Sequence, residues 1–129
     1  MVPQLHEGEY VFCSVNMEVL PAGALPAGPL PDPADIICSF REEEGLTLVL
    51  ARSVADRLQL PYEFIAAWIT LTVHSSLEAV GLTAAFSKAL ADRQISCNCI
   101  AAYHHDHIFV PAKDAALAME TLRELAGNT

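Results

Sequence analysis

The sequence contains few basic residues. Seven Lys and Arg stand against sixteen Asp and Glu, which gives a formal net charge of −9. Nucleic acids and anionic membranes are bound through clustered Lys and Arg, so this composition argues against both kinds of partner. The most apolar run, residues 64–73, is too short for a membrane-spanning helix, and residues 1–9 have neither the basic nor the apolar region of a signal peptide. These absences predict a soluble, cytoplasmic protein.

Recognisable catalytic motifs are also lacking. The sequence has no GxGxxG, P-loop or HExxH motif, and no serine or cysteine lies in the signature of a hydrolytic nucleophile. Only 18% of the residues are charged and 53% are hydrophobic, which is enough to build the core of one domain or of two very small ones. We therefore expect a folded protein that is not an enzyme and that uses no cofactor.

The four cysteines lie in apolar, strand-like stretches, where a free cysteine behaves as a small hydrophobic residue. They are Cys13, Cys38, Cys97 and Cys99. We expect free thiols in a reducing compartment. Cys97 and Cys99, together with the His-His-Asp-His run at residues 104–107, contain side chains that suit zinc or copper. Structural zinc sites usually place at least two residues between paired cysteines, so we expect no metal here, and a metal-binding module stays open as an alternative.

Hydrophobic periodicity predicts alternating strands and helices. Runs rich in β-branched and aromatic residues indicate strands at 9–15, 36–41, 46–51, 64–73, 95–103 and 107–110. Apolar residues at three- and four-residue spacing, or capping patterns, indicate helices at 53–58, at 77–92 and from 111 or 112 to 126. Ser53 and Asp56 are expected to cap the first of these helices. Residues 20–35 contain closely spaced prolines and predict a loop.

Two segments carry a resemblance to a known family. Residues 80–96 contain Val-Gly-Leu, Ala-Ala-Phe, Leu-Ala and Ile-Ser in this order, and residues 101–110 read Ala-Ala-Tyr-His-His-Asp-His-Ile-Phe-Val. This order resembles the ACT-domain superfamily, and in particular the short tandem proteins of the aspartate kinase-like type. The hairpin residues that match are Tyr103, Asp106, Ile108 and Val110. The chain departs from the pattern at Gln94, usually glycine, and at residues 101–102, usually Ser-Thr.

The resemblance implies an α+β, ferredoxin-like βαββαβ fold, with antiparallel sheets and helices on one face. The C-terminal half is one strand short of this pattern, and we expect residues 9–15 to supply the strand unless the edge is left for a partner. The N-terminal half lacks a first helix. We therefore expect two small ACT-like halves that share strands, an incomplete unit at 1–61 and a second unit at 62–129. Free-standing ACT proteins commonly pair, so a homodimer is expected.

The first candidate site is the turn before the helix predicted at 77–92. Ser75 and Glu78 have the spacing of a capping box, and the amides of a helix N-terminus suit a carboxylate or a phosphate. Gly81 has no Cβ, so a ligand or a neighbouring backbone can approach closely. The resemblance implies that amino acids bind at this turn, at the interface with a paired ACT unit. Capping and close helix–sheet packing explain the same residues without a ligand.

The second candidate site is the hairpin around Asp106. Its carboxylate could bind an ammonium or guanidinium group, with Tyr103 as a stacking wall, or could simply cap the turn. The resemblance implies a ligand-lining role, because the corresponding hairpin lines the pocket of related arginine sensors. The candidate ligand-binding residues are His74, Ser75, Ser76, Val80, Gly81, Leu82, Tyr103, His104 and Asp106. We predict a non-catalytic regulatory protein that binds an amino acid, and the alternative is a structural interaction subunit without a ligand.

Overall fold

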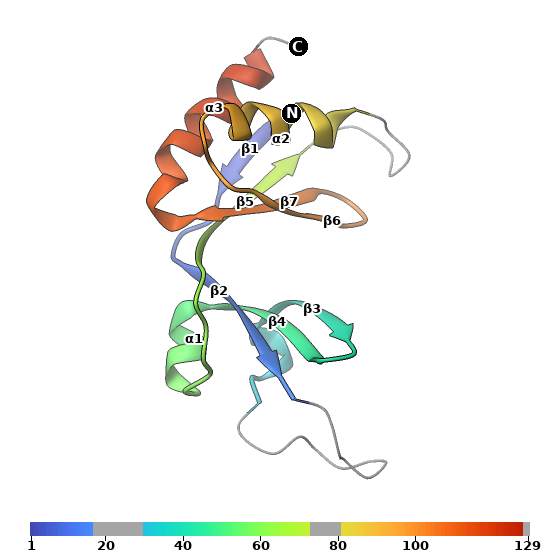
Figure 1. Ribbon diagram of the computed structural model, residues 1–129, viewed down its shortest axis with the longest axis vertical. Coiled ribbons are helices and arrows are strands. Elements are labelled where there is room, and N and C mark those ends of the chain that lie inside the picture. Colours follow the sequence, from blue (N-terminus) through green and yellow to red (C-terminus); the bar gives the residue numbers. More distant parts are fainter. Residues whose placement is uncertain (17–29, 73–80, 128–129) are drawn as a thin grey trace. The chain divides into compact units, whose positions relative to one another are not determined.

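The computed structural model describes residues 1–16, 30–72 and 81–127. The chain forms two compact units, shown in Figure 1: unit 1 consists of Met1–Glu7 and Ala66–Thr129, and unit 2 consists of Gly8–Ile65. The boundary expected between residues 61 and 62 is close to the junction of the units, but the N-terminal residues belong with the C-terminal half. Among the described residues, no helix is long and apolar enough to cross a membrane.

Unit 1 is a four-stranded antiparallel sheet with the strand order β1-β5-β7-β6 and two helices. Its elements are β1 (Val2–Leu5), β5 (Ile65–Thr72), α2 (Leu82–Asp92), β6 (Asn98–Ala101), β7 (Asp106–Pro111), the short 3-10 helix η2 (Ala112–Asp114) and α3 (Ala115–Gly127). From β5 onwards the order is strand, helix, strand, strand, helix, as the sequence predicts. The α+β, ferredoxin-like fold class is confirmed.

A strand that we did not predict, β1, completes this sheet within unit 1, where we expected residues 9–15. Val2 pairs with Thr72 and Leu5 pairs with Ile69, and the His6 amide continues the ladder by donating to the Trp68 carbonyl at 2.9 Å. The residues of β1 read Val-Pro-Gln-Leu, a weak strand pattern, and proline is tolerated because β1 is an edge strand of unit 1. The run at 9–15 instead forms a strand of unit 2.

Helices α2 and α3 cover one face of the unit 1 sheet and bury its core. The apolar stripes predicted for both helices are confirmed at their central positions, where Phe86, Leu90 and Leu122 are fully buried. The core also contains Ala67, Ile69, Leu71, Ile95, Ile108, Val110, Ala118 and Met119. Because side chains alternate across a strand, the neighbours of these core residues on β5 and β7, Trp68, Thr70 and His107, project from the opposite face.

Helix α2 begins at Leu82, so the predicted start at residue 77 is wrong. Gly81 precedes the helix with φ of +96°, a left-handed conformation that glycine adopts readily and that a right-handed helix cannot contain. The capping box predicted from Ser75 and Glu78 lies outside the described residues.

The C-terminus of α2 is closed by a Schellman motif. The amide of Gln94 donates to the Ala91 carbonyl at 2.9 Å, and the amide of Ile95 donates to the Leu90 carbonyl at 3.0 Å. Leu90 and Ile95 are both buried, which supplies the hydrophobic contact of this motif. Gln94 has φ of +60°, the left-handed position that is usually glycine. The family pattern has glycine at this position. Gln94 therefore places a Cβ in a left-handed backbone conformation, which is unfavourable for residues that have a Cβ.

Replacing Gln94 by glycine should stabilise unit 1 by about 0.5–1 kcal/mol. Left-handed φ costs a residue with a Cβ about 1–2 kcal/mol, and the larger backbone entropy of glycine in the unfolded chain offsets part of this gain. Urea denaturation followed by Trp68 fluorescence measures the change. The matched control is Gln94→Ala, which keeps the Cβ and should show no comparable gain; equal stabilisation by both variants would contradict the explanation from φ.

Unit 2 is a three-stranded antiparallel sheet with the order β3-β4-β2 and one short helix. Its elements are β2 (Tyr10–Val15), the 3-10 helix η1 (Pro33–Asp35), β3 (Ile36–Glu42), β4 (Gly45–Ala51) and α1 (Arg52–Arg57). Its core consists of Val11, Cys13, Val15, Leu48, Leu50, Val54 and Ala55. Most of the loop predicted at 20–35 lies outside the described residues.

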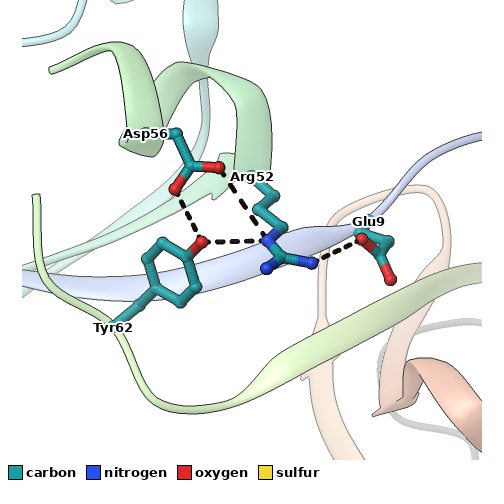
Figure 2. A network of polar contacts seen from close by, with 4 residues as sticks. All are labelled: Glu9, Arg52, Asp56 and Tyr62. Atoms are coloured by element: carbon teal, nitrogen blue, oxygen red, sulfur yellow. Dashed lines mark hydrogen bonds and ion pairs between the residues drawn. The ribbon is translucent and has the colours of Figure 1, made fainter. Parts of the chain in front are cut away.

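The predicted capping of α1 by Ser53 and Asp56 is wrong, because the helix begins at Arg52 and no side chain in the described part of the chain caps it. Figure 2 shows what the polar residues do instead. Arg52 Nε donates to Tyr62 Oη at 2.9 Å, Arg52 Nη1 donates to Glu9 Oε1 at 2.9 Å, and Tyr62 Oη donates to Asp56 Oδ1 at 2.6 Å. The hydrogen bonds that Arg52 donates to Tyr62 and Glu9 raise its pKa. This network joins the segment before β2, the helix α1 and the segment that follows it.

Candidate functional site

The turn before α2 is described only at its end. Gly81 and Leu82 are described, whereas His74, Ser75, Ser76 and Val80 lie outside the described residues. The Gly81 carbonyl accepts the first bond of the helix, from the Ala85 amide at 3.0 Å, and Leu82 packs against the core of unit 1. No described atom lies within 4 Å of a Cβ built on Gly81, so in the described part of the chain its positive φ, and not a close approach, requires glycine.

The hairpin between β6 and β7 places two candidate residues in solvent. The turn closes through a hydrogen bond from the Ala102 amide to the His105 carbonyl at 3.0 Å. Tyr103 is 81% exposed, and its ring meets the ring of His104 edge-on with the centroids 4.8 Å apart. His104 is also exposed. Tyr103 is therefore not enclosed by the described residues, and its role as a stacking wall stays a prediction.

Asp106 has a different position, at the first residue of β7. It pairs with Leu71 of β5 on one side and with Ala101 of β6 on the other. Directly paired residues point to the same face of a sheet, and Leu71 belongs to the core beneath the helices, so the Asp106 side chain projects toward the helix-covered face. Within the described residues its carboxylate has no hydrogen bond and no ion pair, so the cap that we considered for this turn is not formed there.

The hairpin that contains Asp106 and the start of α2 lie at the same end of unit 1 (Figure 1). Asp106 lies beside the C-terminal end of β5, and the chain passes from this end of β5 to Gly81 and α2. The first-turn amides of an α-helix have no partner within the helix and carry partial positive charge. This end of unit 1 therefore combines a carboxylate with a helix N-terminus.

The four cysteines are free thiols with different exposures. Cys13 is buried in the core of unit 2, Cys38 and Cys97 are half-buried, and Cys99 is exposed, so the expectation that Cys99 is a core residue is wrong. Cys97 packs partly buried against the core of unit 1, and burial, with a smaller effect of Cys99, raises its pKa to about 11. Burial and the charge of Asp106 raise the pKa of the Cys99 thiol. No group of three or more His, Cys, Asp or Glu among the described residues is arranged to hold a metal ion.

A second polar cluster, which we did not predict, lies on the face of the unit 1 sheet that is opposite the helices. It contains His6, Trp68, Thr70 and His107. The signal in the sequence was the alternation of Trp68 and Thr70 with the buried residues of β5, which marks a second, polar face of that strand. His6 could not be added to this face before the pairing of β1 with β5 was known.

Comparison with known proteins gives the following relationships. Two family models described as ACT domain match the chain, over residues 1–67 and residues 63–124. A Vibrio cholerae protein of unknown function, described as a possible transport protein, is 46% identical to this chain; the match covers 94% of this chain and 86% of that protein, with a TM-score of 0.76. No curated protein sequence matches the chain.

Two aspartate kinase structures show the same fold at low identity. Aspartokinase III of E. coli, in complex with aspartate and ADP, is 13% identical with a TM-score of 0.62, and the match covers 95% of this chain and 32% of the kinase. A Porphyromonas gingivalis domain, described as the C-terminal regulatory domain of aspartate kinase, is 13% identical with a TM-score of 0.57, and the match covers 95% of this chain and 94% of that domain.

Proposed function

The chain belongs to the ACT-domain family, and we propose that it is a non-catalytic regulatory protein that binds a free amino acid in unit 1. ACT domains are typically regulatory, ligand-binding domains. Tandem matches to this family, and a fold shared with a regulatory domain of aspartate kinase, support such a role.

The observation that carries the proposal is the position of Asp106. Its carboxylate lacks a partner among the described residues and projects toward the helix-covered face, at the end of the sheet where α2 begins. A free amino acid carries a carboxylate and an ammonium group close together. The amides at the start of α2 suit the carboxylate, and Asp106 suits the ammonium group through a charge-assisted hydrogen bond. We extend the proposed site to the turn residues His74, Ser75, Ser76 and Val80, as the family resemblance implies.

We further propose that the protein is a cytoplasmic homodimer. Each copy would contain two ACT units, at residues 1–61 and 62–129, except that strand β1 of the first segment pairs with β5 of the second. ACT domains often oligomerise. In the described residues, β3 and β6 are terminal strands of their sheets, and each offers an unpaired backbone edge to which a second copy could add a strand.

The test is a thermal-shift screen against the twenty amino acids. Calorimetry then measures the affinity of any ligand found, and light scattering measures the mass of the protein in solution and so tests the homodimer. We expect one amino acid, or one side-chain class, to raise the melting temperature by several degrees at saturation. Asp106→Asn should abolish this shift. Glu43→Gln, which removes an exposed carboxylate at the hairpin of unit 2, should retain it.

Three outcomes would count against the proposed function or its site. If none of the amino acids raised the melting temperature of the wild-type protein, the interaction-subunit alternative would be favoured. If Asp106→Asn kept the full shift, the ligand would bind elsewhere. A shift with zinc alone would favour the Cys and His residues of the β6–β7 region.

A further inference from the structure

The polar cluster of unit 1 connects the N-terminal strand to the centre of the sheet. The hydroxyl oxygen of Thr70 lies 2.7 Å from His6 Nε2 and 3.1 Å from His107 Nδ1. The indole Nε1 of Trp68 donates to the same His107 Nδ1 at 3.1 Å, and the imidazole of His6 stacks on the indole with the ring centroids 3.5 Å apart and an interplanar angle of 7°. Since His6 directly follows β1, these contacts hold the end of that strand on β5.

The hydrogen positions in this cluster are constrained. An indole N–H can only donate, so His107 Nδ1 must carry a lone pair and the imidazole of His107 must be neutral. Thr70 has one proton to donate. If His6 Nε2 carries a proton it donates to Thr70, which then donates to His107; if it does not, Thr70 donates to His6. The cluster therefore accepts a proton on His6 without losing a hydrogen bond, but a proton on His107 Nδ1 opposes the Trp68 N–H.

Protonation of both histidines opposes the arrangement most strongly. The Thr70 oxygen has two lone pairs and can accept from both ring nitrogens, but two positive charges would then lie on either side of this residue, which is only 6% exposed. The proton on His107 Nδ1 would also face the Trp68 N–H. We propose that this cluster is a pH-sensitive latch, which holds β1 on the sheet of unit 1 at neutral pH and releases it when His6 and His107 are both protonated.

The charged and titratable groups around His107 mostly act in the same direction. The ring of His105 lies 6.4 Å away on the same hairpin, and its buried Nδ1 has no hydrogen-bond partner among the described residues. Burial lowers the pKa of His107, the neighbouring His105 and His6 lower it further, and only Asp106 raises it. Burial also lowers the pKa of His6. From β6, the residue paired with His107 is the uncharged Ile100.

The sign of the effect follows from these directions. Because the folded pKa values of both histidines lie below the unfolded value of about 6.5, the unfolded or detached segment binds protons first as the pH falls. The stabilising contribution of the cluster is complete above about pH 6.5 and is lost as the pH falls from there through the lowered folded pKa values. Release of β1 would uncover the edge of β5 and the part of α3 that β1 contacts.

The single tryptophan of the chain makes the latch directly observable, because Trp68 is a member of the cluster. The experiment follows the emission of the full-length protein from pH 8 to pH 5 and, at both ends, the hydrogen-exchange protection of the segment 1–7, with β4 as the internal reference. We expect a sigmoidal red shift of the emission with a midpoint below 6.5, and at least a tenfold loss of protection in segment 1–7 relative to β4.

Matched variants separate the latch from general acid sensitivity. In His107→Asn the side-chain oxygen can accept from Trp68 as Nδ1 does but cannot gain a proton, so we expect neither the red shift nor the loss of protection. His104→Asn, at the exposed hairpin tip, should behave as wild type. His6→Gln serves as a second test if His107→Asn does not fold. The proposal is overturned if segment 1–7 stays protected at pH 5 in the wild type, or if the non-titrating variant shows the same transition.

Discussion

Replacing Phe86 by alanine is expected to lower the free energy of unfolding of unit 1 by about 3–5 kcal/mol. Phe86 is the largest fully buried residue of α2, with 0% exposure, in the core beneath the helices of unit 1. The truncation loses the transfer free energy of the ring and leaves a cavity that the rigid sheet can fill only in part. An effect of this size is a large fraction of the stability of a small domain.

Urea denaturation monitored by Trp68 emission measures this effect, because the only tryptophan lies in unit 1. The matched control is Thr83→Ala, on the same helix but exposed, which should change the free energy of unfolding by less than about 0.5 kcal/mol. If Phe86→Ala were no more destabilising than Thr83→Ala, α2 would not pack on the sheet as described.

Replacing Gly45 by alanine is expected to destabilise unit 2 by about 2–4 kcal/mol. Gly45 begins β4 with φ of +155°, and a Cβ at this position would lie 2.7 Å from the carbonyl oxygen of Val15 on the paired strand β2. It would also lie 3.1 Å from Ser14 Oγ. A backbone carbonyl within the β2–β4 ladder cannot move without disturbing its hydrogen bonds, so the clash adds to the cost of the unfavourable φ.

Gly8→Ala is the control for the backbone conformation alone. Gly8 also has a positive φ, +96°, but a Cβ at this position would have Tyr10 Oη as its nearest neighbour, at 3.9 Å, which is an ordinary contact. We expect this variant to lose only about 1–2 kcal/mol. Denaturation followed by circular dichroism compares the two, and equal losses would show that the approach of Val15 does not matter.

The residues of the candidate site stay a prediction. The sequence indicated both a helix-start turn and the hairpin with Asp106, because glycine, capping residues and an isolated acidic residue are local signals. That Asp106 projects toward the helix-covered face depends on its register with Leu71, a pairing between residues far apart in the sequence. The exposure of Tyr103 likewise depends on the position of the hairpin tip, which no local pattern specifies.

The elements of the fold were largely determined by the sequence itself. The helical stripes that contain Phe86 and Leu122, and the β-prone runs around them, reflect periodicities within a single segment, and these periodicities are sufficient to predict strand and helix order. The left-handed residue Gln94 was also marked locally, as the position at which the pattern has glycine.

Only the tertiary structure decided which segment completes the unit 1 sheet and which side chains form its polar cluster. Val-Pro-Gln-Leu at the N-terminus has no strong strand pattern, and it becomes a strand because the exposed edge of β5 offers hydrogen bonds to it. His6 and Thr70 are 64 positions apart in the sequence, so no local periodicity relates them. Their contact exists because β1 pairs with β5, and the pairing of strands depends on the whole fold and not on the local sequence.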